Sequence, residues 1–157
     1  MSLVSRPADV HDFDFLHGLW AVRHRRLRQR LAGCDDWEEF RSTYAVESRV
    51  DGRVSLGEFA TEDGRFRGLS LRLFDAERAS WSLNWVSDRA ALAPPLVGRF
   101  EGDRGTFLGD EVHEGRPVKI RIVWLRLTDG RARVEQAFSP DGVAWETNWT
   151  MDFTRLR

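Results

Sequence analysis

The sequence predicts an all-β fold, a single antiparallel up-and-down barrel of about eight to ten strands with a short N-terminal helix covering one end. Four Asp-Gly pairs, which begin at Asp51, Asp63, Asp129 and Asp141, mark tight hairpin turns. The first two pairs lie twelve residues apart, and so do the last two, which fits one strand and one turn of a meander. Between the turns, apolar and polar residues alternate with a period of two, as expected of strands.

The N-terminal segment departs from this pattern. Residues 1–8 are expected to be flexible, and residues 8–17 are predicted to form the short helix, with Phe13 on its apolar side. Residues 19–31 fit two interpretations. Trp20, Val22 and His24 alternate as in a strand, whereas Leu27 and Leu31 have a helical spacing.

Ten candidate strands can be placed between the turn signals: residues 18–30, 37–50, 53–60, 66–74, 80–87, 97–102, 105–111, 118–128, 131–139 and 145–155. In three of them, residues of one parity share a face: Leu69, Leu71 and Leu73; Trp81, Leu83 and Trp85; and Trp145, Thr147, Trp149, Met151 and Phe153. Short strands leave unpaired edges unless the sheet closes or packs on a second sheet. A closed barrel is therefore favoured, with a β-sandwich as the alternative.

Composition narrows the classes of function. The 157 residues are enough for one domain, and a net charge of −1 does not provide the basic excess that nucleic-acid binding requires. No apolar run is long enough to span a membrane as a helix, and the N-terminus lacks the apolar core of a secretory signal. Cys34 is the only cysteine, which excludes an intramolecular disulfide. A cytoplasmic protein with neither a nucleic-acid nor a membrane partner is expected.

The sequence resembles the calycins, the superfamily of lipocalins and fatty-acid-binding proteins. Gly18-Leu-Trp20 matches the Gly-x-Trp motif that opens the first strand of those barrels. Further segments are similar to a bacterial calycin-like family of undefined function: His24–Leu27, Trp37–Phe40, Gly105–Asp110, Glu135–Gly142 and Trp145–Trp149. The resemblance spans residues 11–155. It implies a barrel with a central cavity, and it brings no established catalytic residues.

Two charged or titratable residues of the first strand are candidates for a site. If Trp20 points inward, as the motif tryptophan does in calycins, alternation also directs Val22, His24 and Arg26 inward. Buried charge requires a partner, which a ligand carboxylate or phenolate or an internal glutamate would supply. A bulge after Val22 would instead turn the run outward. His24 is the candidate acid or base, with Tyr44 as its candidate partner.

Further side chains are predicted to face the cavity by strand parity. The ligand-binding candidates are Arg26, Trp81, Trp85, Trp124, Arg126, Gln136 and Trp149. A few polar groups in a mostly apolar cavity are typical of a small-molecule site. The alternative is that they form buried hydrogen-bond pairs that only set the strand register. Of the remaining tryptophans, Trp20 is predicted to seal the barrel floor and Trp145 to anchor the last hairpin.

Neither a metal nor another cofactor is expected. His11, Asp14 and His17 would share one side of a helix, but spacing of this kind arises readily by chance, and zinc sites need three or four close ligands. The basic run at residues 23–30 is followed by acidic residues 35–39, with which it can pair across a hairpin.

The predicted function is binding of a small, mostly apolar or aromatic molecule in the barrel cavity. The alternative is an enzyme, an isomerase, cyclase or lyase that uses His24 as acid or base in the same cavity. A structural module or homodimer that acts through its surface is the third hypothesis.

Overall fold

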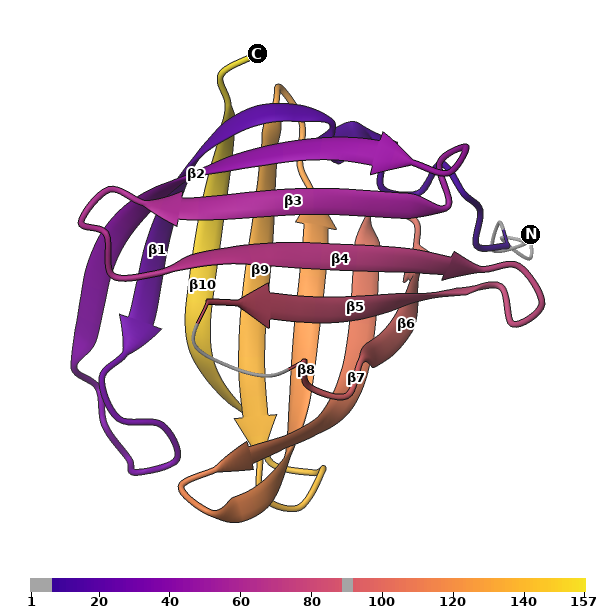
Figure 1. Cartoon of the computed structure of the whole chain (residues 1–157). Helices are drawn as coiled ribbons and strands as arrows, with labels where there is room; N and C mark the ends of the chain where they lie inside the picture. Colours follow the sequence, from indigo (N-terminus) through magenta and orange to yellow (C-terminus); the bar gives the residue numbers. More distant parts are fainter. Residues whose placement is uncertain (1–6, 89–91) are drawn as a thin grey trace.

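The computed structural model describes residues 7–88 and 92–157. Ten antiparallel strands close into one barrel, in which each strand pairs with its neighbours in sequence and the last pairs with the first (Figure 1). The strands are β1 (Gly18–Leu27), β2 (Trp37–Arg49), β3 (Val54–Thr61), β4 (Arg67–Asp75), β5 (Ser80–Ser87), β6 (Leu96–Glu101), β7 (Arg104–His113), β8 (Arg116–Arg126), β9 (Arg131–Ser139) and β10 (Glu146–Arg155). The predicted all-β barrel is confirmed, and the sandwich alternative is wrong because the sheet closes. The expected flexibility of residues 1–8 concerns a segment of which residues 1–6 lie outside the described part of the chain.

All four Asp-Gly pairs lie in turns between consecutive strands. The turn between β9 and β10 is held by Asp141, whose carboxylate accepts hydrogen bonds from the backbone N–H groups of Val143 and Ala144 and from the Ser139 hydroxyl. The same bonds, led by that from Val143, hold the pKa of Asp141 below its usual range. Turn chemistry in this sequence therefore sets the strand boundaries.

The predicted helix over residues 8–17 is wrong. The chain instead forms turns and a single 3₁₀ turn, η1 (Asp14–Leu16), with backbone bonds of the i→i−3 type. The reason lies in the aspartates, since the Asp9 and Asp12 carboxylates accept bonds from nearby backbone N–H groups and compete with α-helical bonding. Residues 19–31 begin as a strand, which ends at Leu27.

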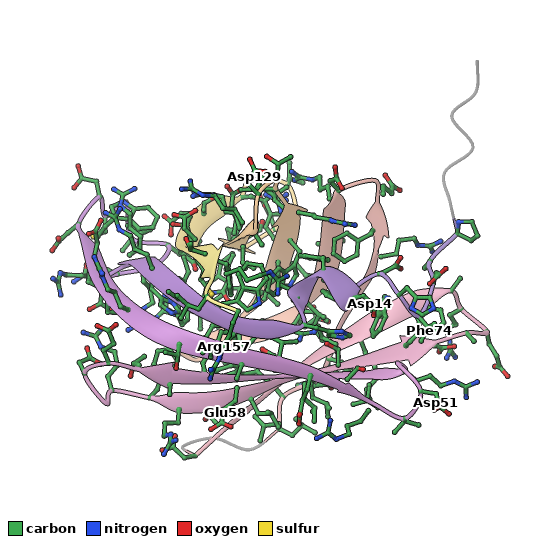
Figure 2. All side chains as sticks on the ribbon, turned by 90° about the horizontal axis from the view of Figure 1, so that it is seen from above. Asp14, Asp51, Glu58, Phe74, Asp129 and Arg157 are labelled. Carbon is green, nitrogen blue, oxygen red and sulfur yellow. The ribbon has the colours of Figure 1, made fainter. Side chains whose placement is uncertain are left out.

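This N-terminal segment nevertheless covers one end of the barrel, where the turn that carries Asp14 lies across the packed side chains (Figure 2). Phe13 is buried among aromatic rings and contacts Trp81 and Phe100 edge to face, with ring centroids 5.0 and 5.1 Å apart. The Trp20 indole donates a hydrogen bond of 2.8 Å to the carbonyl of Leu16. Arg155 of β10 donates to the carbonyls of Phe15 and His17, which fastens the segment to the end of the last strand. This end of the barrel is called the packed end below.

Two details of strand orientation differ from what the pattern indicates. Leu69, Leu71 and Leu73 do share a face, but Leu73 is exposed and it is Arg72 on the opposite face that is buried. On β10, the pairing with β9 shifts between Thr147 and Trp149, which marks a β-bulge at Asn148.

The bulge reverses the faces of the first residues of β10. Glu146 is paired with Phe138, which points inward, and its carboxylate accepts a hydrogen bond from the backbone N–H of Leu31. Trp145, which we predicted to anchor the last hairpin, is half-buried, and the Arg121 guanidinium lies 4.5 Å from the centroid of its ring.

The β5–β6 pair is the shortest seam of the barrel. Its register comprises only Trp81–Gly98, Ser82–Val97 and Leu83–Leu96, whereas β1 and β2 are paired from Gly18 to Leu27. The rest of β5 runs beyond this pairing, toward the end of the barrel opposite the packed end.

Candidate functional site

A cavity of about 500 Å³ occupies the part of the barrel away from the packed end. Its walls are largely apolar: Phe59, Phe66, Leu83, Trp85, Leu96, Ile120, Ile122, Trp124, Val134, Phe138, Trp149 and Met151. Residues at or just after the ends of β1, β5 and β7 also line it: Arg30, Asp88 and His113. These ends form the mouth of the cavity.

Glycines on inward faces make room for two aromatic rings. A Cβ at Gly57 would lie 2.1 Å from the Tyr44 hydroxyl oxygen, and a Cβ at Gly68 would lie 2.1 Å from the Trp85 ring. Trp85 thereby lies over β4 and lines the cavity while remaining 40% exposed.

His24 lines the cavity, and both of its ring nitrogens are in hydrogen bonds. The Trp149 indole N–H donates to Nδ1 over 3.2 Å, and Nε2 lies 2.7 Å from the Ser42 hydroxyl oxygen. An indole can only donate, so Nδ1 is unprotonated and the proton is on Nε2. Burial, with the neighbouring positive charges of Arg26 and Arg65, lowers the pKa of His24 to about 3. His24 is therefore a neutral hydrogen-bonding side chain at pH 7.

Arg26 also lines the cavity, close to the mouth, and it is paired with an internal glutamate. Its Nε and Nη2 donate to Glu38 Oε1 over 3.0 and 2.7 Å, and its guanidinium lies 4.9 Å from the centroid of the Trp149 ring. Arg65 bonds the other oxygen of Glu38 over 3.0 Å. Burial alone would raise the pKa of Glu38, but the bonds from both arginines outweigh burial and lower it. The cross-hairpin charge pairing that we predicted is thus present between β1 and β2.

Arg72, which sequence reasoning did not select, projects from β4 and also lines the cavity. Its side chain is only 1% exposed. Nε and Nη2 donate to Ser55 Oγ over 3.1 and 2.9 Å, and Nη1 donates to the Tyr44 hydroxyl over 2.5 Å. The rings of Phe13 and Trp124 lie 5.0 and 5.9 Å from the guanidinium carbon, which places Arg72 where the cavity meets the packed end, at the floor of the cavity.

A signal for Arg72 was present in the sequence. The turn after Asp75 pairs Phe74 with Trp81, and Arg72 with Leu83. Residues paired across antiparallel strands share a face, so the inward face of Trp81 and Leu83 also implies an inward Arg72.

Gln136 lines the cavity and donates from Nε2 to Asn148 Oδ1 over 2.9 Å. Among the side chains that the structure describes, Asn148 Nδ2 is the buried nitrogen without a hydrogen-bond partner. The bulge in β10 turns this amide inward, which the period of two could not indicate.

The sequence-derived candidates thus fall into two groups. His24, Arg26, Trp85, Trp124, Gln136 and Trp149 line the cavity. Trp81 is fully buried against Phe13 in the packed end, so our expectation that it faces the cavity is wrong. The Tyr44 hydroxyl bonds Arg72, whereas His24 bonds Ser42 and Trp149, so Tyr44 is not the partner of His24 that we predicted. Arg126 is exposed at the packed end, with its guanidinium 5.5 Å from the centroid of the Phe15 ring, so our expectation that it faces the cavity is wrong.

The three residues weighed as metal ligands lie on the N-terminal segment. The Asp14 carboxylate is 2.7 Å from His11 Nδ1 and 3.8 Å from His17 Nε2. Within residues 7–88 and 92–157, no group of three or more histidine, cysteine, aspartate or glutamate side chains is placed to hold a metal ion.

Comparison with known proteins gives no match to any protein-family model and no significant similarity to a curated protein. The closed ten-stranded barrel is compatible with the calycin resemblance at the level of fold. No helix in the described part of the chain is both long enough and apolar enough to cross a membrane.

Proposed function

We propose that the protein binds a small, flat and mostly apolar organic molecule in its barrel cavity. The observation that carries the proposal is the cavity itself, about 500 Å³ with aromatic and aliphatic walls. Pockets of this size suit ligands of a few hundred daltons, and a few fixed polar groups commonly orient them. Gln136, which lines the cavity and is held by a hydrogen bond to Asn148, is a group of this kind.

The enzyme alternative receives less support from the geometry. A general acid or base works best with a pKa near the working pH and with a nitrogen free to meet the substrate. His24 has a pKa of about 3 and both nitrogens already bonded. Binding without turnover is therefore the function we propose. We also propose that the protein acts in the cytoplasm. Its single cysteine, Cys34, supports this, because cytoplasmic proteins rarely depend on disulfides.

Three cavity tryptophans provide the test. A panel of naphthalene, naphthoic acid, naphthamide, naphthylmethylamine and haem is titrated while tryptophan fluorescence is recorded, and binding is verified by calorimetry. At least one compound is expected to bind with a Kd on the order of 10–100 µM. If none binds at millimolar concentration to protein with an intact β-sheet circular-dichroism spectrum, the proposal is wrong.

A further inference from the structure

Arg72 is a buried charge without a counter-ion among the described residues. Arginine stays protonated in proteins, so the guanidinium is positive wherever it lies. Its bonds go to the neutral oxygens of Ser55 and Tyr44, and no described carboxylate is within ion-pair distance. Burial of an unpaired charge is unfavourable unless another group compensates for it.

The side chain is held ready to receive such a group. Ser55 and Tyr44 take three of its five N–H groups, one each from Nε, Nη1 and Nη2. One N–H therefore remains on each terminal nitrogen. Two N–H groups on adjacent nitrogens of a planar guanidinium match the two oxygens of a carboxylate.

The surroundings favour a ligand with one anionic end. Arg72 lies at the floor of the cavity, where an entering molecule would place its leading group, and the apolar walls continue toward the mouth. The Arg26 charge near the mouth is already paired with Glu38. The acidic residues Asp88, Asp110 and Glu111 also line the cavity. Asp88 and Asp110 are exposed, so water screens their repulsion, and the half-buried Glu111 interacts electrostatically with Arg30, whose positive charge offsets it.

We infer that the ligand is an aromatic or alicyclic carboxylic acid whose carboxylate pairs with Arg72 at the floor of the cavity. This inference rests on the proposed function and names the chemical class of its ligand. Ser55 and Tyr44 are positioning residues, since they orient the guanidinium and leave its two remaining N–H groups for the ligand.

The test compares three probes of one shape and different charge: naphthoic acid, naphthamide and naphthylmethylamine, titrated by calorimetry at pH 7. The acid is expected to bind at least about tenfold more tightly than the neutral amide, because hydrogen bonds between charged groups are stronger than neutral ones. The amine, which is cationic at this pH, is expected to bind most weakly.

Variants locate the preference. In Arg72→Met the affinity for the acid should fall at least about tenfold, while that for the amide should change by less than about threefold. Arg72→Lys retains the positive charge but lacks the paired N–H groups of the guanidinium, so it should keep part of the preference for the acid over the amide. The control is Arg126→Met, which removes an exposed arginine at the packed end and should leave all three affinities unchanged.

Failure of the inference is distinct from failure of the proposed function. If the amide binds the wild type as tightly as the acid does, or if Arg72→Met and Arg72→Lys both keep the full preference, the inference is overturned although the cavity still binds a ligand. If Arg30→Met loses the preference for the acid and the Arg72 variants keep it, the carboxylate binds at the mouth of the cavity, and the inference is overturned as well. If no probe binds the wild type, the proposed function itself fails. Should Arg72→Met not fold, the wild-type comparison and Arg72→Lys decide the question.

Discussion

Gly57 lies on β3 beside the hydroxyl of Tyr44, and no larger residue fits there without displacing that ring. Tyr44 is fully buried and stacks on Phe59 with a centroid distance of 3.9 Å. Gly68 has a similar relation to Trp85, but Trp85 is partly exposed and can move aside. A side chain at either glycine would therefore clash with an aromatic ring, but only the ring of Trp85 has space to move.

Gly57→Ala is expected to lower the free energy of unfolding by about 3 kcal/mol, and Gly68→Ala by about 1 kcal/mol, because overpacking costs least where the neighbour can shift. Urea denaturation of both variants measures the difference. Equal losses would show that the Tyr44 ring is as free to move as Trp85.

His24 makes stability depend on pH. Its native pKa of about 3 lies below the value near 6.5 of an unperturbed histidine, so the unfolded chain takes up a proton first as the pH falls. This residue alone should lower the free energy of unfolding by about 1.4 kcal/mol per pH unit below pH 6.5, until the native imidazole titrates near pH 3.

Denaturation of the wild type and of His24→Gln at pH 7 and pH 5 isolates this contribution. The variant should lose stability over that interval by about 2 kcal/mol less than the wild type, provided that it folds. An NMR titration of the wild type gives a direct check, and a midpoint for His24 near pH 6.5 would contradict the expectation.

Alternation along β1, together with the inward Trp20 that the calycin resemblance implies, directed His24 and Arg26 to the cavity wall, where both lie. The same rule did not select Arg72, because Leu69, Leu71 and Leu73 form the more apolar face of β4 and suggest the opposite orientation. The face of β4 is set by its register with β5, where Arg72 lies beside Leu83. Parity within one strand cannot supply that register, whereas the pairing across the turn can.

Among the strands, the β5–β6 seam is the weakest part of the closed sheet. Three register pairs join these strands, and β6 is the shortest strand. Local openings of a native protein occur where few backbone bonds and contacts must break. Leu83, Trp85 and Leu96 border this seam and also line the cavity, so its opening would change access to the cavity.

Hydrogen–deuterium exchange should therefore be fastest among the strands in peptides that cover β6 and slowest in those that cover β1 and β2. A bound cavity ligand should slow exchange at β6 more than at β1. Uniform exchange over all ten strands would show that the short seam does not open separately.

Strand limits were predictable because each turn carries its own chemistry, an Asp-Gly pair or another cluster of turn residues. The helix over residues 8–17 failed for a local reason, since its aspartates bond backbone N–H groups in the turns that replace it. The predicted faces of the first residues of β10 were wrong for another reason. The extra residue of the bulge at Asn148 cannot be recognised in the alternation of one strand, and only the pairing with β9 reveals the shift.

The whole barrel divides along its axis into a packed end and a hollow end. Phe13, Trp81, Phe100 and Phe107 belong to one cluster of buried aromatic side chains at the packed end. The cavity takes up the other part, so the tryptophans serve two purposes. Trp20 and Trp81 are core, Trp85 and Trp149 line the cavity, and Trp124 does both.

Substitutions at the two ends should separate stability from binding. Phe107→Ala is expected to lower the free energy of unfolding by about 3–5 kcal/mol. Ile122→Trp, which fills part of the cavity, should weaken binding of naphthoic acid at least about tenfold and change stability by less than about 1.5 kcal/mol. Calorimetry and urea denaturation of both variants measure the two effects, and tight binding to Ile122→Trp would place the ligand outside the cavity.

The division of the barrel has a consequence for how such a protein can evolve. Phe59, Trp124 and Val134 belong both to the buried core and to the cavity wall, whereas Phe13, Trp81, Phe100 and Phe107 of the packed end belong to the core and do not line the cavity. Mutations in the rest of the wall alter which molecule fits and leave these packed-end rings in place. Most mutations destabilise a protein, and a mutation that changes binding is lost if stability falls below the level that function needs. A barrel that keeps part of its stabilising core outside the ligand chamber avoids some of that conflict, so its descendants can exchange ligands while their architecture stays the same.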